Sequence, residues 1–206
     1  PAVRVAVGDH YGLTKGRSVM GKIVNALHLM GFDEVYDTSF SADLTIMEES
    51  AEFLDRIKKG EKLPLLTSCC PAWVRFVETK YPELLPYVST CKSPMEMFGA
   101  VLKEYYKPAD EEAGFETVSV AVMPCVAKKY EAAREEFKRN EVLDVDYVIT
   151  TKELILMIKE LGVQFQEIEP SAPDMPFSIN SGAGVIFGVT GGVMEAALRH
   201  VADKNN

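Results

Sequence analysis

The sequence predicts an α/β fold made of two lobes, each a twisted and mostly parallel β-sheet flanked by helices. Short apolar runs alternate with amphipathic segments of helical length along the chain, an order typical of repeated βαβ units around a parallel sheet. An acidic stretch containing a glycine, residues 108–117, interrupts this alternation and is typical of a joint. We therefore expect a first lobe at residues 1–107 and a second lobe at residues 118–206, with the functional site in the cleft between them.

The first lobe begins with an alternating valine run and continues as a series of strand and helix patterns. Its strand candidates are short and apolar, whereas its helix candidates place apolar residues three and four positions apart. The expected strands are residues 3–7, 35–37 and 63–68, and the expected helices are residues 16–30, 42–59, 73–80 and 94–107.

The second lobe repeats this alternation after the joint. Gly162 follows a helical pattern in the way of a C-terminal glycine cap. Residues 169–184 are rich in Pro, Ser, Asp and Gly, which predicts an ordered loop. The expected strands are residues 118–123 and 147–150, and the expected helices are residues 128–138, 151–161 and 193–202.

Length and composition argue against several functional classes. The chain has 206 residues, of which 47% are hydrophobic, enough to bury a core. Its formal net charge of -9 argues against a nucleic-acid or anionic-membrane partner, both of which need basic surface. No apolar run approaches the roughly 20 residues of a membrane-spanning helix, and the first residues lack the order of a signal peptide. We expect a cytoplasmic protein; because Pro1 is not an initiator methionine, a periplasmic location stays open.

The four cysteines are the most informative residues. Cys69 and Cys70 are adjacent and follow an apolar run, and Cys125 follows another, each site beside a proline. The carboxyl ends of strands are where open α/β sheets present their chemistry. Adjacent cysteines rarely bond to each other, because neighbouring side chains in an extended segment point to opposite faces. Four cysteines are also too few for a disulfide scaffold, so the ligation of a metal cluster is the first hypothesis.

Two motifs carry a family resemblance. Residues 67–73 read TSCCPAW and residues 123–128 read MPCVAK, and they resemble the first two signatures of the iron-only ([FeFe]) hydrogenases. The resemblance extends over nearly the whole chain and includes residues 1–6, 45–49, 92–94 and 188–196. The third signature of the family, a downstream Cys-x-x-x-Cys, is absent, as are the ferredoxin-like modules usually found upstream. The chain therefore resembles most, but not all, of a catalytic domain.

The resemblance implies a cofactor and its ligands. In the family, a [4Fe-4S] cubane is joined through a cysteine sulfur to a binuclear iron site that carries CO, cyanide and a bridging amine dithiolate, together the H-cluster. The resemblance assigns cubane ligands to Cys70 and Cys125. Such a cluster needs four thiolates, so a missing C-terminal segment with two further cysteines is an implied partner. Cys91 has no ligand role in the family pattern and is expected to be a small packed core residue.

Two residues of the motifs receive chemical roles by resemblance. Cys69 is the thiol that passes protons to and from the bridging amine, a task suited to a pKa of roughly 8.5; the alternative is a packed cysteine beside a ligand. Lys128 donates a hydrogen bond to an iron-bound cyanide, whereas the alternative is a solvated surface charge. Backbone groups of Pro1 and Ala2 fall where the family supplies another donor.

A proton route is implied by a further match. Glu49, Glu52 and Arg56 are spaced by three and four, so they line one face of the expected helix. A solvated stripe of salt bridges is the alternative interpretation of such spacing. By resemblance, Glu49 and Glu52 form a path with Ser89 that delivers protons to Cys69, and Arg56 marks its outer end.

Apolar residues complete the expected site. Met123 and Phe187 match positions at which the family walls its pocket and excludes water from the diatomic ligands. By spacing alone, both residues would be assigned to the core.

The resemblance implies reversible reduction of protons to H2 at the H-cluster. Its implied partners are H2 and protons, a ferredoxin-like electron-carrier domain or subunit, and hydrogenase maturation proteins. One alternative is an iron-hydrogenase-like protein of iron–sulfur cluster assembly, which lacks the binuclear site and typically loses the relay cysteine or the cyanide-binding lysine. Another is an inactive fragment that needs a separately supplied segment. Cys69 and Lys128 are both present, which favours the hydrogenase.

Overall fold

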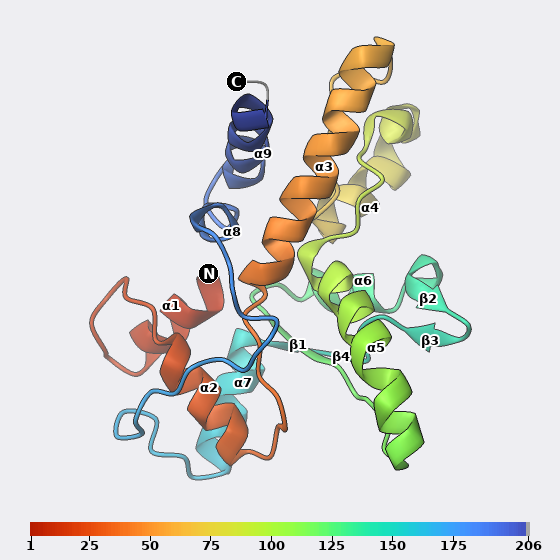
Figure 1. The fold of residues 1–206 in the computed structure, drawn as a ribbon. Coiled ribbons are helices and arrows are strands. Elements are labelled where there is room, and N and C mark those ends of the chain that lie inside the picture. Colours follow the sequence, from red (N-terminus) through yellow and green to blue (C-terminus); the bar gives the residue numbers. More distant parts are fainter. Residues whose placement is uncertain (205–206) are drawn as a thin grey trace.

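The structure, a computed structural model that describes residues 1–204, has an α/β fold. Strands β1 (Val120–Met123) and β4 (Tyr147–Thr150) pair in parallel, with Val120 opposite Tyr147. Helices surround this pair (Figure 1), and α7 (Thr151–Glu160) follows β4 directly. The α/β class, the parallel pairing and both strands of the second half are therefore as the sequence predicts.

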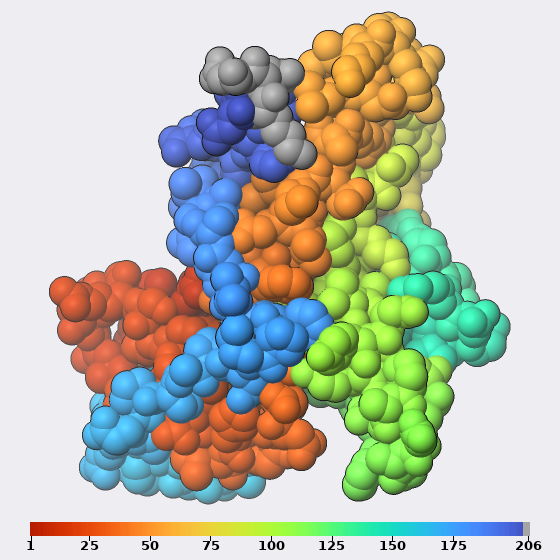
Figure 2. Space-filling view, in the orientation of Figure 1, coloured from red at the N-terminus to blue at the C-terminus, as the bar shows by residue number. Residues whose placement is uncertain are grey.

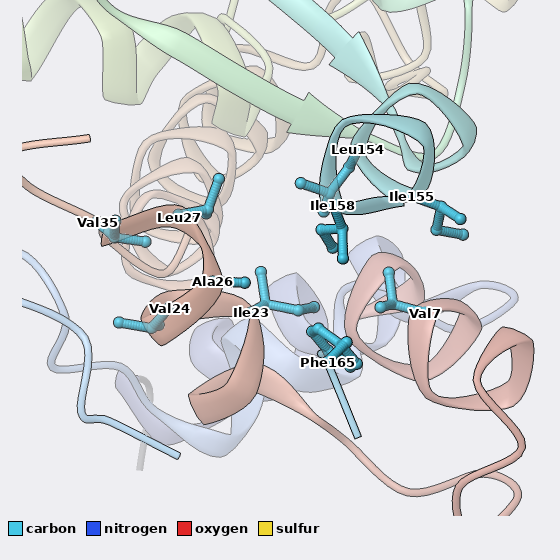
Figure 3. Packing of buried hydrophobic residues seen from close by; sticks show 10 residues of the cluster. All are labelled: Val7, Ile23, Val24, Ala26, Leu27, Val35, Leu154, Ile155, Ile158 and Phe165. Atoms are coloured by element: carbon cyan, nitrogen blue, oxygen red, sulfur yellow. The ribbon is translucent and has the colours of Figure 1, made fainter. Parts of the chain in front are cut away.

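The larger apolar core lies between the parallel strands and the N-terminal helices. Helices α1 (Ala2–His10), α2 (Met20–Leu29) and α7 meet there, as Figure 3 shows. Phe165, just beyond α7, is 1% exposed and belongs to this core. The buried members are Val7, Ile23, Val24, Ala26, Leu27, Val35, Leu154, Ile155, Ile158 and Phe165.

Two strands expected in the first half are wrong. Residues 3–7 belong to helix α1, in which Val3 and Val7 stand one turn apart and both pack on the core. Burial of this helical face outweighs the β-propensity of the valines. Residues 35–37 have no strand assignment: the Val35 N–H donates to Asp174 Oδ2 at 2.6 Å, and thus to a side chain.

The strand expected at residues 63–68 is reduced to one bridge. Leu66 pairs in parallel with Val88; the Leu66 N–H donates to Tyr87 O at 2.8 Å and the Ser89 N–H donates to Leu66 O at 2.7 Å. Among the described residues, this bridge is the only strand pairing in the expected first lobe. It nevertheless fixes the segment that leads into the adjacent cysteines.

The long helices match the predictions more closely. They are α3 (Ser39–Lys59), α4 (Pro71–Lys80) and α5 (Pro94–Ala113), with a 3-10 helix η1 (Pro82–Tyr87) after α4. Helix α5 continues through the first part of the expected joint and ends at Gly114, whose φ of 82° is left-handed. The division into two lobes at residues 108–117 stays a prediction.

The helix expected at residues 128–138 is too long. Helix α6 (Ala127–Ala132) is followed by a 3-10 turn, η2 (Glu135–Phe137), and by an antiparallel ribbon of β2 (Lys138–Arg139) and β3 (Val142–Leu143). Asn140 and Glu141 both have positive φ, as a tight hairpin turn requires. This turn uses Asn-Glu rather than Asn-Gly, so its sequence signal is weak.

The C-terminal segment returns along the surface to α3. Figure 2 shows the stretch after α7 as a band across the N-terminal half. Lys22 Nζ bonds Ile168 O at 2.5 Å, and Asp43 Oδ1 accepts from Ser181 Oγ at 2.6 Å. Helices α8 (Gly182–Ile186) and α9 (Gly192–Lys204) then pack on α3; residues 205–206 of the expected second lobe lie outside the described residues. Within residues 1–204, no helix is both long and apolar enough to traverse a bilayer.

Candidate functional site

The two cysteine motifs lie against each other. Cys70 is the N-cap of α4 and Cys125 lies between β1 and α6, and these two helices pack together. Lys128 Nζ donates to the backbone oxygen of Cys69 at 3.0 Å, which ties the second motif to the first. Cys70 and Cys125 are exposed, whereas Cys69 is half-buried. The exposed thiols of Cys70 and Cys125 are accessible to a ligand.

The Lys128 ammonium is held inside the protein and is not a solvated surface charge. Its side chain is 13% exposed and pairs with Glu131 Oε2 at 2.6 Å, while the Glu131 side chain is 4% exposed. Glu131 was not expected at the site. Its position three residues after Lys128 on one helix face is the signal that could have found it.

Cys69 is surrounded so that it keeps its proton. Burial, reinforced by the negative charge of Glu49, raises the pKa of the Cys69 thiol to about 11, and the opposing charge of Lys128 compensates only in part. The thiol is therefore neutral near pH 7, next to a carboxyl group on α3.

Glu49 is almost completely buried, with 2% exposure. Burial raises the pKa of this carboxyl to about 6, although hydrogen bonds from the Ser89 hydroxyl and the Ser68 backbone lower it. Its Oε2 has no hydrogen-bond partner within the part of the chain that the structure describes. A carboxyl with this pKa can gain and lose a proton near neutral pH.

Glu52 has the opposite surroundings. Its Oε2 accepts from Ser89 Oγ at 2.8 Å and from the Thr90 N–H at 3.0 Å, and its Oε1 accepts from Arg56 at 2.5 Å. Burial by itself would raise the pKa of Glu52, but these donors outweigh it and the pKa is lowered. Arg56, 6% exposed, also donates to the carbonyl of Tyr87 at 2.9 Å. The structure thus brings Glu49, Glu52, Arg56 and Ser89 into one network, and the solvated-stripe alternative is wrong.

Cys91 lies in this network, contrary to the expectation of a packed core residue. Its Sγ is 3.7 Å from Glu52 Oε2 and its N–H donates to Ser89 Oγ at 3.2 Å. Burial raises the pKa of the Cys91 thiol to about 11. The expectation failed because the turn that follows η1 directs this residue toward α3.

Apolar residues expected at the site gather around one cavity of about 380 Å³. Pro1, Ala2 and Met123 line it, together with Gly188. A Cβ at position 188 would lie 2.8 Å from Pro1 Cγ, so glycine permits this close approach. Phe187 is half-buried beside Gly188 at the end of α8 and is not part of the lining.

The described residues offer part of a metal-ligand set. Cys70 and Cys125 present exposed thiols from neighbouring elements, which suits a cluster bound by thiolates. No group of three or more His, Cys, Asp or Glu side chains within residues 1–204 is arranged to hold a metal ion. Two thiols are half of the four that a [4Fe-4S] cluster needs.

Comparison with known proteins agrees with this geometry. All 206 residues match the family model "Iron only hydrogenase large subunit, C-terminal domain". The chain is 52% identical to the NADP-reducing hydrogenase subunit HndD of Solidesulfovibrio fructosivorans, over 97% of this chain and 35% of that protein. It is also 32% identical to the cytosolic Fe-S cluster assembly factor narfl of Danio rerio, over 98% of this chain and 51% of that protein.

A solved structure is similar along nearly the whole chain. It is an [FeFe]-hydrogenase studied for oxygen inactivation through modification and degradation of the 2Fe subcluster of the H cluster. The TM-score is 0.82 at 45% identity, covering 98% of this chain and 51% of that one. The chain spans about a third to a half of the length of the proteins it matches.

Proposed function

Because the chain belongs to the iron-only hydrogenase large-subunit family, we propose that it forms the greater part of a catalytic domain that reversibly reduces protons to H2. The observation that carries this proposal is the contact between the motifs: Lys128 reaches across to the Cys69 carbonyl beside two exposed thiols. This contact supports the assignment of Cys69 and Lys128 to one site, which the resemblance to hydrogenases implies.

The residues present fit part of an H-cluster site. Cys70 and Cys125 would hold the [4Fe-4S] cluster, and Lys128 would donate to an anionic diatomic ligand of the binuclear iron site. Backbone groups of Pro1 and Ala2 would supply a further donor, and Met123 and Phe187 would form the apolar wall. Pro1, Ala2 and Met123 line one cavity, and Phe187 precedes Gly188 of the same lining. When bound, the cofactor supplies electrons and the metal centre at which H2 is made or split.

The chain itself supplies the proton route. The Ser89 hydroxyl bonds Glu52, and its hydrogen bond to Glu49 lowers the pKa of that carboxyl, so Ser89 joins the two. Glu49 exchanges protons near neutral pH and lies close enough to Cys69 to raise the pKa of its thiol. Arg56 holds Glu52 in place at the outer end. Protons would pass between Glu52, Ser89, Glu49 and the Cys69 sulfur.

The partners follow from the partial ligand set and from the family. A segment with two further cysteines would complete the cubane, a ferredoxin-like iron–sulfur domain or subunit would carry electrons, and maturation proteins would insert the binuclear site.

The second candidate function is iron–sulfur cluster assembly. It is favoured by the similarity to the assembly factor narfl. A protein of that kind would bind an iron–sulfur cluster without H2 turnover. Retention of both Cys69 and Lys128 at one site favours the hydrogenase.

The decisive experiment compares three cysteine variants of the whole matured protein. Cys70→Ser and Cys125→Ser should each lose iron and H2 production, because each removes a thiolate ligand. Cys91→Ser is the matched control and should keep its iron. Wild-type protein that binds the cubane but neither makes nor consumes H2 would overturn the hydrogenase and support the assembly function. The 206-residue chain by itself should hold a [4Fe-4S] cluster poorly; a stable stoichiometric cluster would contradict the ligand assignment.

A further inference from the structure

Glu96 is a buried acid that the proposed mechanism does not use. It lies in the first turn of α5 and is 0% exposed. Neither of its carboxyl oxygens has a hydrogen-bond partner among residues 1–204. Leaving a carboxylate in this state is costly, since a buried charge needs a partner or a proton.

Two ion pairs surround this acid. Lys128 and Glu131 of α6 form one, and Lys92 and Asp144, which precede α5 and β4, form the other. The charges of all four act on Glu96. Glu131 and Asp144 are 3% and 2% exposed, so the acidic side chains around Glu96 are shielded from water. The Lys92 side chain is 32% exposed.

The cluster has one more carboxyl group than it has ammonium groups. Glu96, Glu131 and Asp144 face Lys92 and Lys128, and one bound proton makes the sum neutral. Glu96 is the member without a donor, so the proton belongs there. Burial, and then the negative charges of Glu131 and Asp144, raise the pKa of Glu96 to about 8.

We propose that Glu96 is a positioning residue for Lys128. As a neutral acid, it leaves the ammonium to Glu131 and to the Cys69 carbonyl. As a carboxylate, it competes for that ammonium and draws it away from the cysteine motif. The effect on turnover rests on the proposed function, in which Lys128 binds the cofactor; the protonation of Glu96 and its coupling to Lys128 do not.

The first test measures the proton without any activity assay. In the whole protein, the infrared band of a protonated carboxyl should vanish in Glu96→Gln and persist in the control Glu112→Gln, an exposed glutamate of the same helix. The wild-type band should titrate with a midpoint near pH 8. In Lys128→Gln this midpoint should rise, because a stabilising positive charge is gone. A band unaffected by Glu96→Gln, or a midpoint unaffected by Lys128→Gln, would overturn the proposal.

Unfolding provides an independent measure. The folded chain holds a proton at Glu96 that the unfolded chain releases above the ordinary glutamate pKa of 4.5, so stability falls as pH rises from 4.5 to about 8. Relative to Glu96→Gln, the wild-type ratio of folded to unfolded protein should fall about tenfold per pH unit in this window. Parallel pH curves for the two proteins would contradict a proton on Glu96.

Turnover links the acid to the proposed reaction. The alkaline decline of wild-type H2 turnover should be weakened in Glu96→Gln and unchanged in Glu112→Gln. Identical pH profiles for wild type and Glu96→Gln would overturn the positioning role. If no variant or wild type turns over H2, the proposed function fails, while the infrared and unfolding results still decide the protonation and its coupling to Lys128.

Discussion

Glu52 and Glu96 are both glutamates withdrawn from water near the cysteine motifs, yet their surroundings move their pKa values in opposite directions. Glu52 accepts hydrogen bonds from Arg56, Ser89 and the Thr90 N–H, and its pKa is lowered. Glu96 accepts none from the described residues, and its pKa is raised to about 8. Burial alone therefore does not decide protonation; the donors around a carboxyl do.

Glu49 lies between these extremes. It shares the Ser89 hydroxyl with Glu52, but one of its oxygens has no partner among residues 1–204. Its pKa of about 6 is intermediate as well. The pKa values of the three acids therefore form a graded series, from Glu52 through Glu49 to Glu96.

The largest effect is expected from Arg56→Met. This change leaves Glu52 without its cation and the carbonyls of Lys62 and Val88 without a side-chain donor. The Tyr87 carbonyl keeps only the Leu66 N–H. Removing one partner of a buried ion pair costs about 3–5 kcal/mol. Urea unfolding at neutral pH would measure the loss.

The matched control is on the same helix with the same spacing. Lys59 pairs with Asp55 at 2.6 Å, as Arg56 pairs with Glu52, but both side chains are more than half exposed. Lys59→Met should change stability little. An equal loss of unfolding free energy in Arg56→Met and Lys59→Met would show that the hydrogen bonds around Glu52 stabilise the protein no more than an exposed ion pair does.

Glu49→Gln and Glu52→Gln should change opposite limbs of the pH–stability curve. Because the pKa of Glu49 is raised from 4.5 to about 6, the contribution of this carboxyl to the free energy of unfolding is lost as pH rises from 4.5 to about 6. Glu49→Gln should therefore gain up to about 2 kcal/mol of stability at pH 7. Because the pKa of Glu52 is lowered, its contribution is lost as pH falls below 4.5, and Glu52→Gln should lack this acid-induced loss. Chemical unfolding across pH 3–8 would distinguish Glu49→Gln from Glu52→Gln. If both variants changed stability in the same pH range, the opposite pKa shifts of Glu49 and Glu52 would be contradicted.

The smallest effect is expected from Ser89→Ala. Glu52 keeps Arg56 and the Thr90 N–H, so the loss should be about 1 kcal/mol. In the wild type, the Ser89 hydroxyl lowers the pKa of Glu49. This pKa should therefore rise in Ser89→Ala. Infrared titration of the Glu49 carboxyl, with Glu49→Gln to identify its band, would detect the rise; an unchanged midpoint would remove Ser89 from the route.

The sequence predicted the long helices because their apolar spacing and their caps agree. Ser93 caps α5, and a complete capping box of Thr150 and Glu153 begins α7. The strand prediction for residues 3–7 is wrong. The alternating valines are typical of a strand, but the segment is helical because one face of the helix packs on the core. Such packing depends on α2 and α7, which no local pattern specifies.

The candidate site was predicted in part, through motifs and helical spacing. Helical spacing predicted that Glu49, Glu52 and Arg56 share one helix face, and the resemblance assigned Ser89 to the same path. In the structure, Ser89 reaches Glu52 from a distant segment. Cys91 in this network and the surroundings of Glu96 were not predicted, since they depend on which loops and helices meet. The chemical roles assigned by resemblance stay predictions.

The proposed roles of Cys69 as proton relay and Cys70 as cluster ligand are tested most directly by comparing serine variants of the two residues in the whole matured protein. Cys69→Ser should lower H2 turnover by orders of magnitude while iron is retained, because a hydroxyl has a pKa far too high to relay protons. Cys70→Ser should lose the iron itself, because it removes a thiolate ligand. Near-normal turnover in Cys69→Ser, or iron loss in that variant equal to that of Cys70→Ser, would contradict the division of roles between the two residues.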